Sequence, residues 1–239
     1  MTKLSIIIPC RDEEDNVSIV YQNISKNILI SDYEILFIND YSIDLTEQNI
    51  IKLIKKDNKI KLLNNLKKGL GGAIELGLKN ASGKFITILM ADSADSIEDL
   101  NTYIKLMEND DCDAVFGSRF ITGAKTFDYP FTKLVFNRLG NNLARLLFFS
   151  NYNDFTNSFK IYKKNVINYI YPIVSEDFNI FLELPLKIIS RGFSYKIIPI
   201  KYFFRTIGTA KFKIRELGSR YLFTLLYCFI EKILLNKKK

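Results

Sequence analysis

Two carboxylates follow an apolar run near the middle of the chain. The segment "ILMADSADSIEDL", residues 88–100, stops on Asp92 and Asp95 before a stretch with helical spacing. Carboxylate oxygens are ligands that Mg²⁺ and Mn²⁺ favour, so the pair could hold a divalent cation. Asp95 could instead cap the following helix, because Glu98 lies three residues further on, the spacing of a capping box. The sequence leaves both roles open for Asp95.

Polar residues also follow other apolar runs. "SIIIP" leads into "CRDEEDN", "EILFI" into "NDYSID" and "AVF" into "GSRF". Taken singly, these residues have structural explanations, because Asp12 could cap a helix and Arg119 could form a surface ion pair. Asp40 is different, because it lies at the end of its run and is not needed for capping. Its carboxylate could accept a hydrogen bond from a nucleobase.

The elements that carry these residues predict an α/β fold. Apolar β-rich runs alternate with runs of helical period, the pattern of a parallel sheet covered by helices on both faces. We expect strands at Lys3–Pro9, Glu34–Asp40, Ile60–Leu63, Phe85–Met90 and Ala114–Gly117. We expect helices at Glu13–Asn27, Leu45–Lys56, Gly72–Asn80 and Ile97–Glu108. Because the carboxyl ends of parallel strands share one edge, the four polar segments should converge there as a ligand site.

The second half of the chain predicts further elements of both kinds. In order, we expect an amphipathic basic helix at Phe131–Phe149, a strand near Thr156–Tyr162, a helix at Phe178–Ser190 and a strand at Tyr195–Phe204. An apolar stretch near the C-terminus, Tyr221–Ile230, has about half the length of a spanning helix. This last helix could pack on the sheet, or lie in the bilayer interface with the terminal lysines 237–239 near anionic headgroups.

Composition restricts the class of protein. The 239 residues, 48% of them hydrophobic, suffice for one sizeable domain, and the formal net charge is +8. The basic residues are dispersed without any usual nucleic-acid-binding module, which argues against a nucleic-acid partner. Three distant cysteines and no histidine argue against a zinc site and indicate reduced thiols. The N-terminal apolar run is too short for a signal peptide, so we expect a cytoplasmic protein.

Six segments occur in a recognisable order: "SIIIPCRDEEDNV", "EILFINDYSIDLT", "GLGGAIELGLKNASGKFITILMAD", "GSRF", "DFTNSFKIYKK" and "RTIGTAK". Together they resemble the family 2 inverting glycosyltransferases of the GT-A fold. Within that family, the similarity is to the polyprenyl-phosphate branch of dolichol-phosphate-mannose-synthase-like enzymes, from about Leu4 to Lys211. The resemblance implies a mixed, mainly parallel sheet with flanking helices in a domain at 1–212. Its nucleotide-sugar half would be 1–120 and its acceptor half 121–212, followed by a C-terminal helix and basic tail at 213–239.

The resemblance also implies roles for particular residues. Pro9, Glu13 and Asp40 would line the nucleoside pocket, with Arg11 replacing a stacking aromatic residue of the family. Asp92 would help to hold Mg²⁺ or Mn²⁺ on the donor diphosphate. Asp95 is not part of the family's motif, but it could compensate as a second metal ligand. Arg119, Arg205 and Lys211 would hold phosphate groups of donor and acceptor.

Two departures from the family pattern weaken the implied metal and base sites. Met90 stands where the family's metal motif has its first acid, and Asn39 replaces the first acid of the base-binding pair. A divalent cation can keep several waters, so one protein carboxylate and two diphosphate oxygens could suffice. The metal motif without its first acid is therefore compatible with metal binding.

The missing histidine bears on the acceptor. A hydroxyl acceptor needs a general base, whereas a phosphomonoester is already anionic near neutral pH. We therefore expect sugar transfer from a nucleotide-diphosphate sugar to a polyprenyl phosphate, by a protein that could sit peripherally on the inner face of the cell membrane. One alternative is a glycan hydroxyl acceptor with Asp154, Glu176 or Asp177 as base, although Asp154 could simply orient a cationic neighbour. Another is a catalytically weakened nucleotide-sugar binder that serves as a scaffold.

Overall fold

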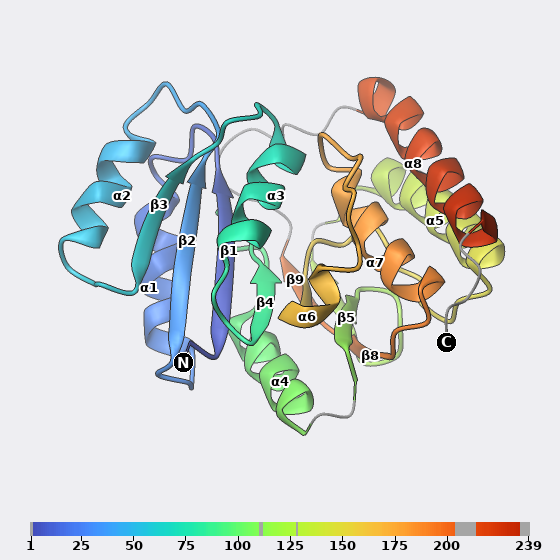
Figure 1. Cartoon of the computed structure of the whole chain (residues 1–239), viewed down its shortest axis with the longest axis horizontal. Helices are drawn as coiled ribbons and strands as arrows, with labels where there is room; N and C mark the ends of the chain where they lie inside the picture. The colour runs from blue at the N-terminus through green and yellow to red at the C-terminus, as the bar shows by residue number, and fades with distance from the viewer. Residues whose placement is uncertain (1, 110–111, 128, 204–213, 235–239) are drawn as a thin grey trace.

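A seven-stranded mixed sheet forms the centre of the fold, with helices on both faces (Figure 1). The computed structural model describes residues 2–109, 112–127, 129–203 and 214–234. The strands are β1 (Leu4–Cys10), β2 (Tyr33–Asn39), β3 (Ile60–Asn64), β4 (Phe85–Ile88), β5 (Ala114–Ser118), β7 (Lys160–Lys163) and β8 (Tyr195–Pro199), in the order β3-β2-β1-β4-β7-β5-β8. Only β7 runs antiparallel to its neighbours β4 and β5. The predicted mixed, mainly parallel sheet is confirmed.

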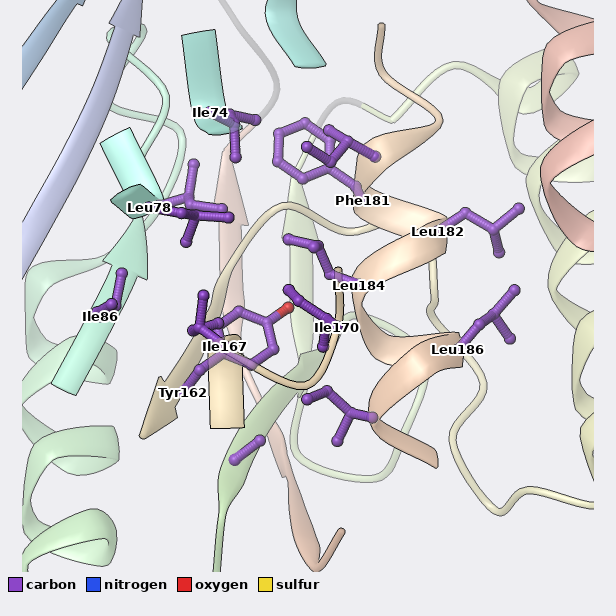
Figure 2. Packing of buried hydrophobic residues seen from close by; sticks show 14 of the residues in the cluster. Ile74, Leu78, Ile86, Tyr162, Ile167, Ile170, Phe181, Leu182, Leu184 and Leu186 are labelled. Atoms are coloured by element: carbon purple, nitrogen blue, oxygen red, sulfur yellow. The ribbon is translucent and has the colours of Figure 1, made fainter. Parts of the chain in front are cut away.

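The central strands are apolar throughout because both faces of the sheet are covered. Every residue of β1 and β2 is buried, which is typical of parallel strands between two helical layers. Helices α1 (Val17–Asn27), α2 (Thr46–Ile54) and α4 (Ile97–Glu108) supply one core. Helices α3 (Leu70–Asn80), α5 (Phe131–Phe148), α6 (Lys164–Ile167), α7 (Ile180–Ser190) and α8 (Ile214–Leu234) supply the other. Figure 2 shows this second core, where α3 and α7 lie on the same face of the sheet and their side chains pack with Ile86 of β4 and Tyr162 of β7.

The connections create a switch point beside β1. The chain proceeds from β1 to β2 and β3 on one side, then returns to β4 on the other side of β1. In open sheets of this kind, ligands bind outside the carboxyl ends of the strands at such a point. The ends of β1, β2 and β4 therefore define the edge where a site is expected.

Several predicted elements differ from the structure. The strand expected at Thr156–Tyr162 begins only at Lys160, because the residues before it form a turn. The strand expected at Tyr195–Phe204 is two strands interrupted at Ile200, and the second, β9 (Lys201–Phe203), leaves the main sheet. It pairs with the unpredicted strand β6 (Lys125–Phe127). Each of these strands has only three residues, too few for a hydrophobic alternation that a sequence pattern could reveal.

Helices α5 and α8 lie side by side at the end of the molecule far from β3 (Figure 1). The ammonium group of Lys232 on α8 donates to the carbonyl oxygen of Leu147 in the last turn of α5, at 3.3 Å. The rings of Phe148 and Phe229 pack between the two helices, with centroids 6.2 Å apart. Among the described residues, no helix is long and apolar enough to cross a membrane.

Candidate functional site

Three loops at the switch-point edge carry unusual backbone conformations. Asp12, Tyr41 and Ser93 have φ angles of 52°, 58° and 56°, and each follows a strand of the central sheet. Residues with side chains avoid this left-handed region, and its recurrence is characteristic of functional sites. The loops after β1, β2 and β4 are thus the first place to look for a ligand site.

Hydrogen bonds connect the loops after β1 and β2 to each other. The amide of Asp12 donates to the Ser42 hydroxyl at 3.1 Å, and the Asp12 carboxylate accepts from the amide of Ile43 at 3.0 Å. The amide of Glu13 donates to the Thr46 hydroxyl at 2.8 Å. The alternative of Asp12 as a helix cap is wrong, because its carboxylate serves the neighbouring loop and α1 begins only at Val17.

Asp40 lies buried where these two loops meet, with 4% of its surface exposed. Its Oδ1 atom accepts from the Asn65 side chain at 2.7 Å and from the Gly69 amide at 2.9 Å. Its Oδ2 atom faces Arg11, whose Nη1 is 4.0 Å away, and Arg11 itself is partly exposed. The Oδ1 atom of Asp40 is therefore held by hydrogen bonds within the protein, while its Oδ2 atom is directed toward the guanidinium of Arg11 at the open edge of the sheet.

The other predicted nucleoside-pocket residues lie near Asp40. Pro9 is buried in β1, opposite Ile38 of β2, two residues before Arg11. The carboxylate of Glu13 is buried and accepts from the side chain of Asn16 at 2.6 Å. The structure thus brings Arg11, Glu13 and Asp40 to the two loops after β1 and β2, with Pro9 in β1 next to them.

Gly69 and Gly71 allow α3 to begin close to a distant loop. Gly69 has a φ of 121°, and a Cβ atom there would lie 2.6 Å from the carbonyl oxygen of Glu176. The amide of Gly71 donates to that same oxygen at 3.0 Å. The glycines therefore serve close packing, and their contacts let the Gly69 amide reach Asp40.

The loop after β4 holds a buried carboxylate without hydrogen-bond partners. Asp92 is partly buried, and its Oδ1 accepts from the Ala94 amide at 3.2 Å. Asp95 is 5% exposed, and within the described part of the chain neither of its oxygens, nor the buried Ser93 hydroxyl, has a hydrogen-bond partner. Burial and the charge of Asp92 raise the pKa of Asp95 to about 8.

The capping alternative for Asp95 is wrong. The residue that caps α4 is Ser96, whose hydroxyl accepts from the Asp99 amide at 3.4 Å. Buried polar groups are nearly always satisfied, so an orphaned carboxylate indicates a missing partner. A cation would satisfy it, because a bound positive charge stabilises the ionised carboxylate against the cost of burial. The residues present thus fit a divalent cation.

The candidate metal site has few protein ligands. No cluster of three or more His, Cys, Asp or Glu suited to a metal occurs within the described ranges. A site with Asp92 and Asp95 alone would leave most coordination positions of Mg²⁺ or Mn²⁺ to water and ligand oxygens. That is the usual arrangement where the cation binds together with a substrate diphosphate.

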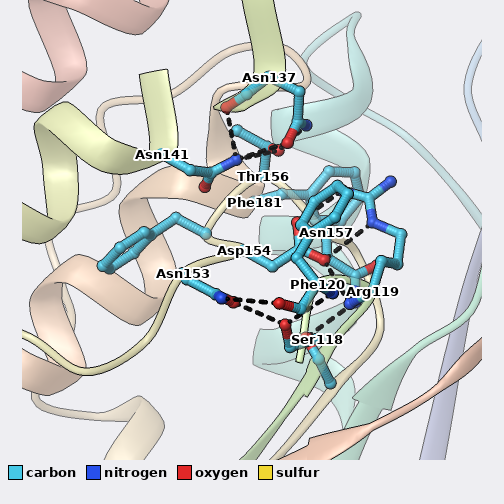
Figure 3. A network of polar contacts seen from close by, with 12 residues as sticks. Ser118, Arg119, Phe120, Asn137, Asn141, Asn153, Asp154, Thr156, Asn157 and Phe181 are labelled. Atoms are coloured by element: carbon cyan, nitrogen blue, oxygen red, sulfur yellow. Dashed lines mark hydrogen bonds and ion pairs between the residues drawn. The ribbon is translucent and has the colours of Figure 1, made fainter. Parts of the chain in front are cut away.

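Arg119, just after β5, and Asp154, in the turn that precedes β7, form a buried ion pair (Figure 3). The guanidinium donates from Nε to Oδ2 at 2.8 Å and from Nη2 to Oδ1 at 2.7 Å, and the Arg119 amide adds a third bond at 2.9 Å. Burial opposes the charge of Arg119, but Asp154 outweighs it and raises the pKa of the guanidinium. Arg119 is therefore not in a surface ion pair, and Asp154 orients a cationic neighbour.

Aromatic rings surround the guanidinium of Arg119. Its Cζ atom lies 5.3 Å from the ring centroid of Phe120, 5.4 Å from that of Tyr129 and 5.0 Å from that of Tyr202. Tyr202 also forms an antiparallel bridge with Asp95, so it connects the ion pair to the loop after β4. The two polar centres consequently adjoin each other.

Some residues at this edge were absent from the sequence prediction. Asn65 directly follows β3, and its side chain donates a hydrogen bond to Asp40. A search for polar residues at the carboxyl end of β3, as for the other parallel strands, would have found it. Lys160 and Tyr202 carried no such signal, because their positions depend on pairings between distant segments. Arg205 and Lys211, predicted to bind phosphate, lie outside the described residues; the strand before them, β9, is held to α4 by the Lys201 amide, which donates to Asp99 at 2.8 Å.

Comparisons with known proteins place this site in a family. The model of the glycosyl transferase family 2 matches residues 5–170, which include the loops of Asp40, Asp92, Arg119 and Asp154. The chain belongs to glycosyl transferase family 2. This family 2 chain is 26% identical over 216 residues to a dolichol-phosphate mannosyltransferase of Pyrococcus furiosus, covering 88% of the chain and 59% of the relative. It is 24% identical over 231 residues to a polyprenol monophosphomannose synthase of Mycolicibacterium smegmatis, covering 90% and 86%.

Solved structures share the GT-A fold of the family 2 chain. Glucosyl-3-phosphoglycerate synthase from Mycobacterium tuberculosis, in complex with Mn²⁺, UDP-glucose and phosphoglyceric acid, matches with a TM-score of 0.73 at 13% identity, covering 95% of this chain and 80% of that one. The same enzyme with Mg²⁺ and UDP matches with a TM-score of 0.70 at 14% identity, covering 95% and 79%. At these identities the likeness establishes the fold.

Proposed function

We propose that this family 2 chain transfers a sugar, with inversion, from a nucleotide-diphosphate sugar to a polyprenyl phosphate, using Mg²⁺ or Mn²⁺ held by Asp92 and Asp95. The observation that carries the proposal is the buried carboxylate of Asp95, in the loop of Asp92 at the switch point, which has no hydrogen-bond partner among the described residues. The names of the two curated relatives support the acceptor class, since both denote enzymes that attach mannose to a polyprenol-type phosphate.

In this proposal the donor nucleoside binds at the loops after β1 and β2. The Oδ2 atom of Asp40 accepts an N–H group of the base, and Arg11 covers the base from the solvent side. The cation, when bound, neutralises charge on the diphosphate leaving group. Asp92 and Asp95 hold it at the end of β4, beside the strand that carries Pro9.

The acceptor is proposed to be a phosphate because, among the described residues, the carboxylate that contacts Arg119 is already committed to it. The chain contains no histidine, and both oxygens of Asp154 are committed to Arg119. A phosphomonoester has a second pKa of about 6 and needs no deprotonation at neutral pH. Arg205 and Lys211 are proposed to hold it, because they follow β9 directly in the chain.

The exposed faces of α5 and α8 support a position on a membrane surface. Each helix presents large apolar side chains to solvent at a spacing of three to four residues. These are Phe131, Val135, Phe136, Leu139, Leu143 and Leu146 on α5, and Leu222, Phe223, Leu226, Ile230, Ile233 and Leu234 on α8. Patches of this kind on a soluble domain mark interaction surfaces. The exposed Arg145 and the terminal lysines 237–239 favour an anionic bilayer as the occupant.

The donor and cation are tested by thermal unfolding. We expect Tm to rise with one nucleoside diphosphate of a UDP, GDP and dTDP panel, and only with Mn²⁺ or Mg²⁺ present, because a ligand of the native state stabilises it. In Asp92→Ala the metal-dependent part of the shift should disappear. A shift that ignores the metal and survives in Asp92→Ala would contradict the metal site.

The acceptor is tested by turnover. We expect release of the nucleoside diphosphate to require a polyprenyl phosphate. Turnover with a glycan hydroxyl but not with the lipid phosphate would favour the alternative acceptor. Metal-dependent donor binding without turnover on either acceptor would favour the scaffold alternative.

The membrane position is tested by flotation with vesicles. The wild-type chain should float with vesicles containing phosphatidylglycerol, and the double variant Leu139→Ser, Leu226→Ser should lose at least about 90% of this binding, since each buried leucine contributes about 1.5–3 kcal/mol. Leu29→Ser, at an exposed apolar position after α1, is the control. If the double variant changes the oligomeric state and not the flotation, the faces join two copies of the chain.

A further inference from the structure

Lys160 is a fully buried cationic residue that the proposed reaction does not use. It is the first residue of β7, the antiparallel strand between β4 and β5, and its exposed fraction is 1%. Lysine is almost never buried to this degree without a partner. The question is what its side chain holds.

The partners of Lys160 are main-chain carbonyl groups. Its Nζ donates to the oxygen of Phe155 at 3.0 Å, to that of Asn157, and to that of Phe181 at 3.4 Å. An ammonium group has three donors, and these three carbonyls match them. No carboxylate is within ion-pairing distance of Lys160 in the described part of the chain. Its ammonium group is therefore held by hydrogen bonds to carbonyl oxygens and not by an ion pair.

The carbonyl of Phe181 needs this donor because of a proline. In an α-helix the carbonyl of residue 181 accepts from the amide of residue 185, four positions later. In α7 that residue is Pro185, which has no amide hydrogen. Lys160 therefore supplies the hydrogen bond that Pro185 removes, and it joins β7 to the first turn of α7.

The other two carbonyls belong to the turn that carries Asp154. The amide of Asn157 donates to the Asp154 carbonyl at 3.2 Å, and the Asn157 side chain donates to the carbonyl of Gly117 at 3.1 Å (Figure 3). This turn presents Asp154 to both the amide and the guanidinium of Arg119. Whatever fixes the turn also fixes Arg119 at the end of β5.

We propose that Lys160 is a positioning residue that clamps the Asp154 turn between β7 and α7 and thereby holds Arg119 in place at the acceptor side of the site. Its kinetic consequence rests on the proposed function, whereas the clamp itself does not. The charged groups around Lys160 are Asp154, Arg119 and Asp95. Burial lowers the pKa of Lys160 to about 7 against the opposing charge of Asp154, so measurements at about pH 6 keep the three-donor form.

The first test is a double-mutant cycle on thermal stability. Lys160→Met should lower Tm by roughly 10 °C, because it leaves three buried carbonyls without donors. Pro185→Ala restores an amide opposite the Phe181 carbonyl, so it should raise Tm by roughly 3 °C more in the Lys160→Met background than in the wild type. Lys164→Met, the same change at an exposed position four residues on, should leave Tm within about 1 °C. Equal effects of Pro185→Ala in both backgrounds would overturn the clamp.

The second test follows Arg119 directly, without any turnover. Its Nε–H group, bonded to Asp154, should give a slowly exchanging NMR signal that is assigned by its loss in Arg119→Lys. In the double variant Lys160→Met, Pro185→Ala we expect exchange at least tenfold faster, and in Lys164→Met no change. An unchanged exchange rate in a folded double variant would reduce Lys160 to a packing role and overturn the positioning proposal.

The third test separates the clamp from the proposed reaction. In the double variant, kcat with polyprenyl phosphate should fall at least tenfold, while the Kd of the nucleoside diphosphate stays within twofold, because Asp40 and its loops lie beyond β1. Wild-type kcat in a folded double variant would overturn the positioning role. If the wild-type chain itself turns over no acceptor, the proposed function fails. The double-mutant cycle on Tm and the exchange rate of the Arg119 Nε–H group would still test whether Lys160 clamps the Asp154 turn.

Discussion

Asp95 and Asp154 are buried carboxylates at the same edge of the sheet, and they differ in what surrounds them. Asp154 has no exposed surface and accepts three hydrogen bonds from Arg119. Asp95 is 5% exposed, and in the described part of the chain neither oxygen has a hydrogen-bond partner. Tyr202 contacts both centres, through its bridge to Asp95 and its ring over Arg119.

The difference indicates that Asp154 has a structural role and that Asp95 has a ligand-binding role. Removing one member of a buried ion pair leaves a charge uncompensated, so the surrounding structure depends on both members. A buried anion without a partner weakens the native state until a ligand supplies the partner. Asp154 should therefore matter mainly for stability, and Asp95 mainly for cation binding and turnover.

The largest expected effect is on folding, from Asp154→Asn. The substitution keeps the shape of the side chain but leaves the Arg119 guanidinium buried without a counter-charge, so the free energy of unfolding should fall by about 3–5 kcal/mol. Urea denaturation measures this loss. Glu75→Gln, which breaks the exposed pair with Lys79 on α3, is the matched control and should cost at most about 0.5 kcal/mol. A loss below about 1 kcal/mol for Asp154→Asn would remove the distinction between the two carboxylates.

The next effect is on turnover, from Asp95→Asn. Without the second carboxylate the cation is held less firmly where the leaving group develops charge, so kcat should fall by about 10²-fold. The free energy of unfolding of the metal-free chain should not decrease, because a side chain of the same shape replaces a carboxyl group that has no hydrogen-bond partner in the described part of the chain. Glu98→Gln, an exposed carboxylate three residues on, should keep wild-type turnover. Loss of stability comparable with that of Asp154→Asn would show that Asp95 is part of the fold after all.

The sequence could predict Asp95 as a candidate and could not predict the role of Asp154. The strands β1, β2 and β4 are fully buried runs, so their ends, and the polar residues there, are visible in the sequence. The pairing of Arg119 with Asp154 joins residues 35 positions apart, and it depends on β7 entering the sheet antiparallel between β4 and β5. That topology has no local signal, since β7 has only four residues.

Local competition between residues also limited the prediction. Asp95 and Ser96 are both good helix caps, and only the backbone decides which of them caps α4. Pro185 lies inside α7, and the sequence alone does not show that a lysine 25 positions earlier replaces its missing amide. Such compensations are made in three dimensions, whereas propensities describe neighbours along the chain.

The smallest expected effect concerns a third buried carboxylate, Glu34 of β2, away from the site. Burial would raise its pKa, but hydrogen bonds from Lys61, Ser5 and Ser82 outweigh burial and lower it to about 2. Because the pKa of Glu34 is 4.5 in the absence of these contacts, its contribution is complete above that pH and is lost as the pH falls toward 2. Glu34→Gln should lower the free energy of unfolding at pH 7 by about 1–2 kcal/mol.

The pH dependence of unfolding distinguishes this satisfied carboxylate from Asp95. Between pH 4.5 and about 2 the wild-type chain should lose stability more steeply than Glu34→Gln, because only the wild type takes up a proton at residue 34 in that range. Glu75→Gln, which removes a carboxylate from an exposed pair, should keep nearly the full wild-type slope. Parallel curves for the wild type and Glu34→Gln would mean that the three hydrogen bonds do not favour the ionised form. A flatter curve for Glu34→Gln would show that Glu34, like Asp154, is a carboxylate whose partners are other groups of the protein. Asp95 differs from both, because it has no such hydrogen-bond partner among the described residues.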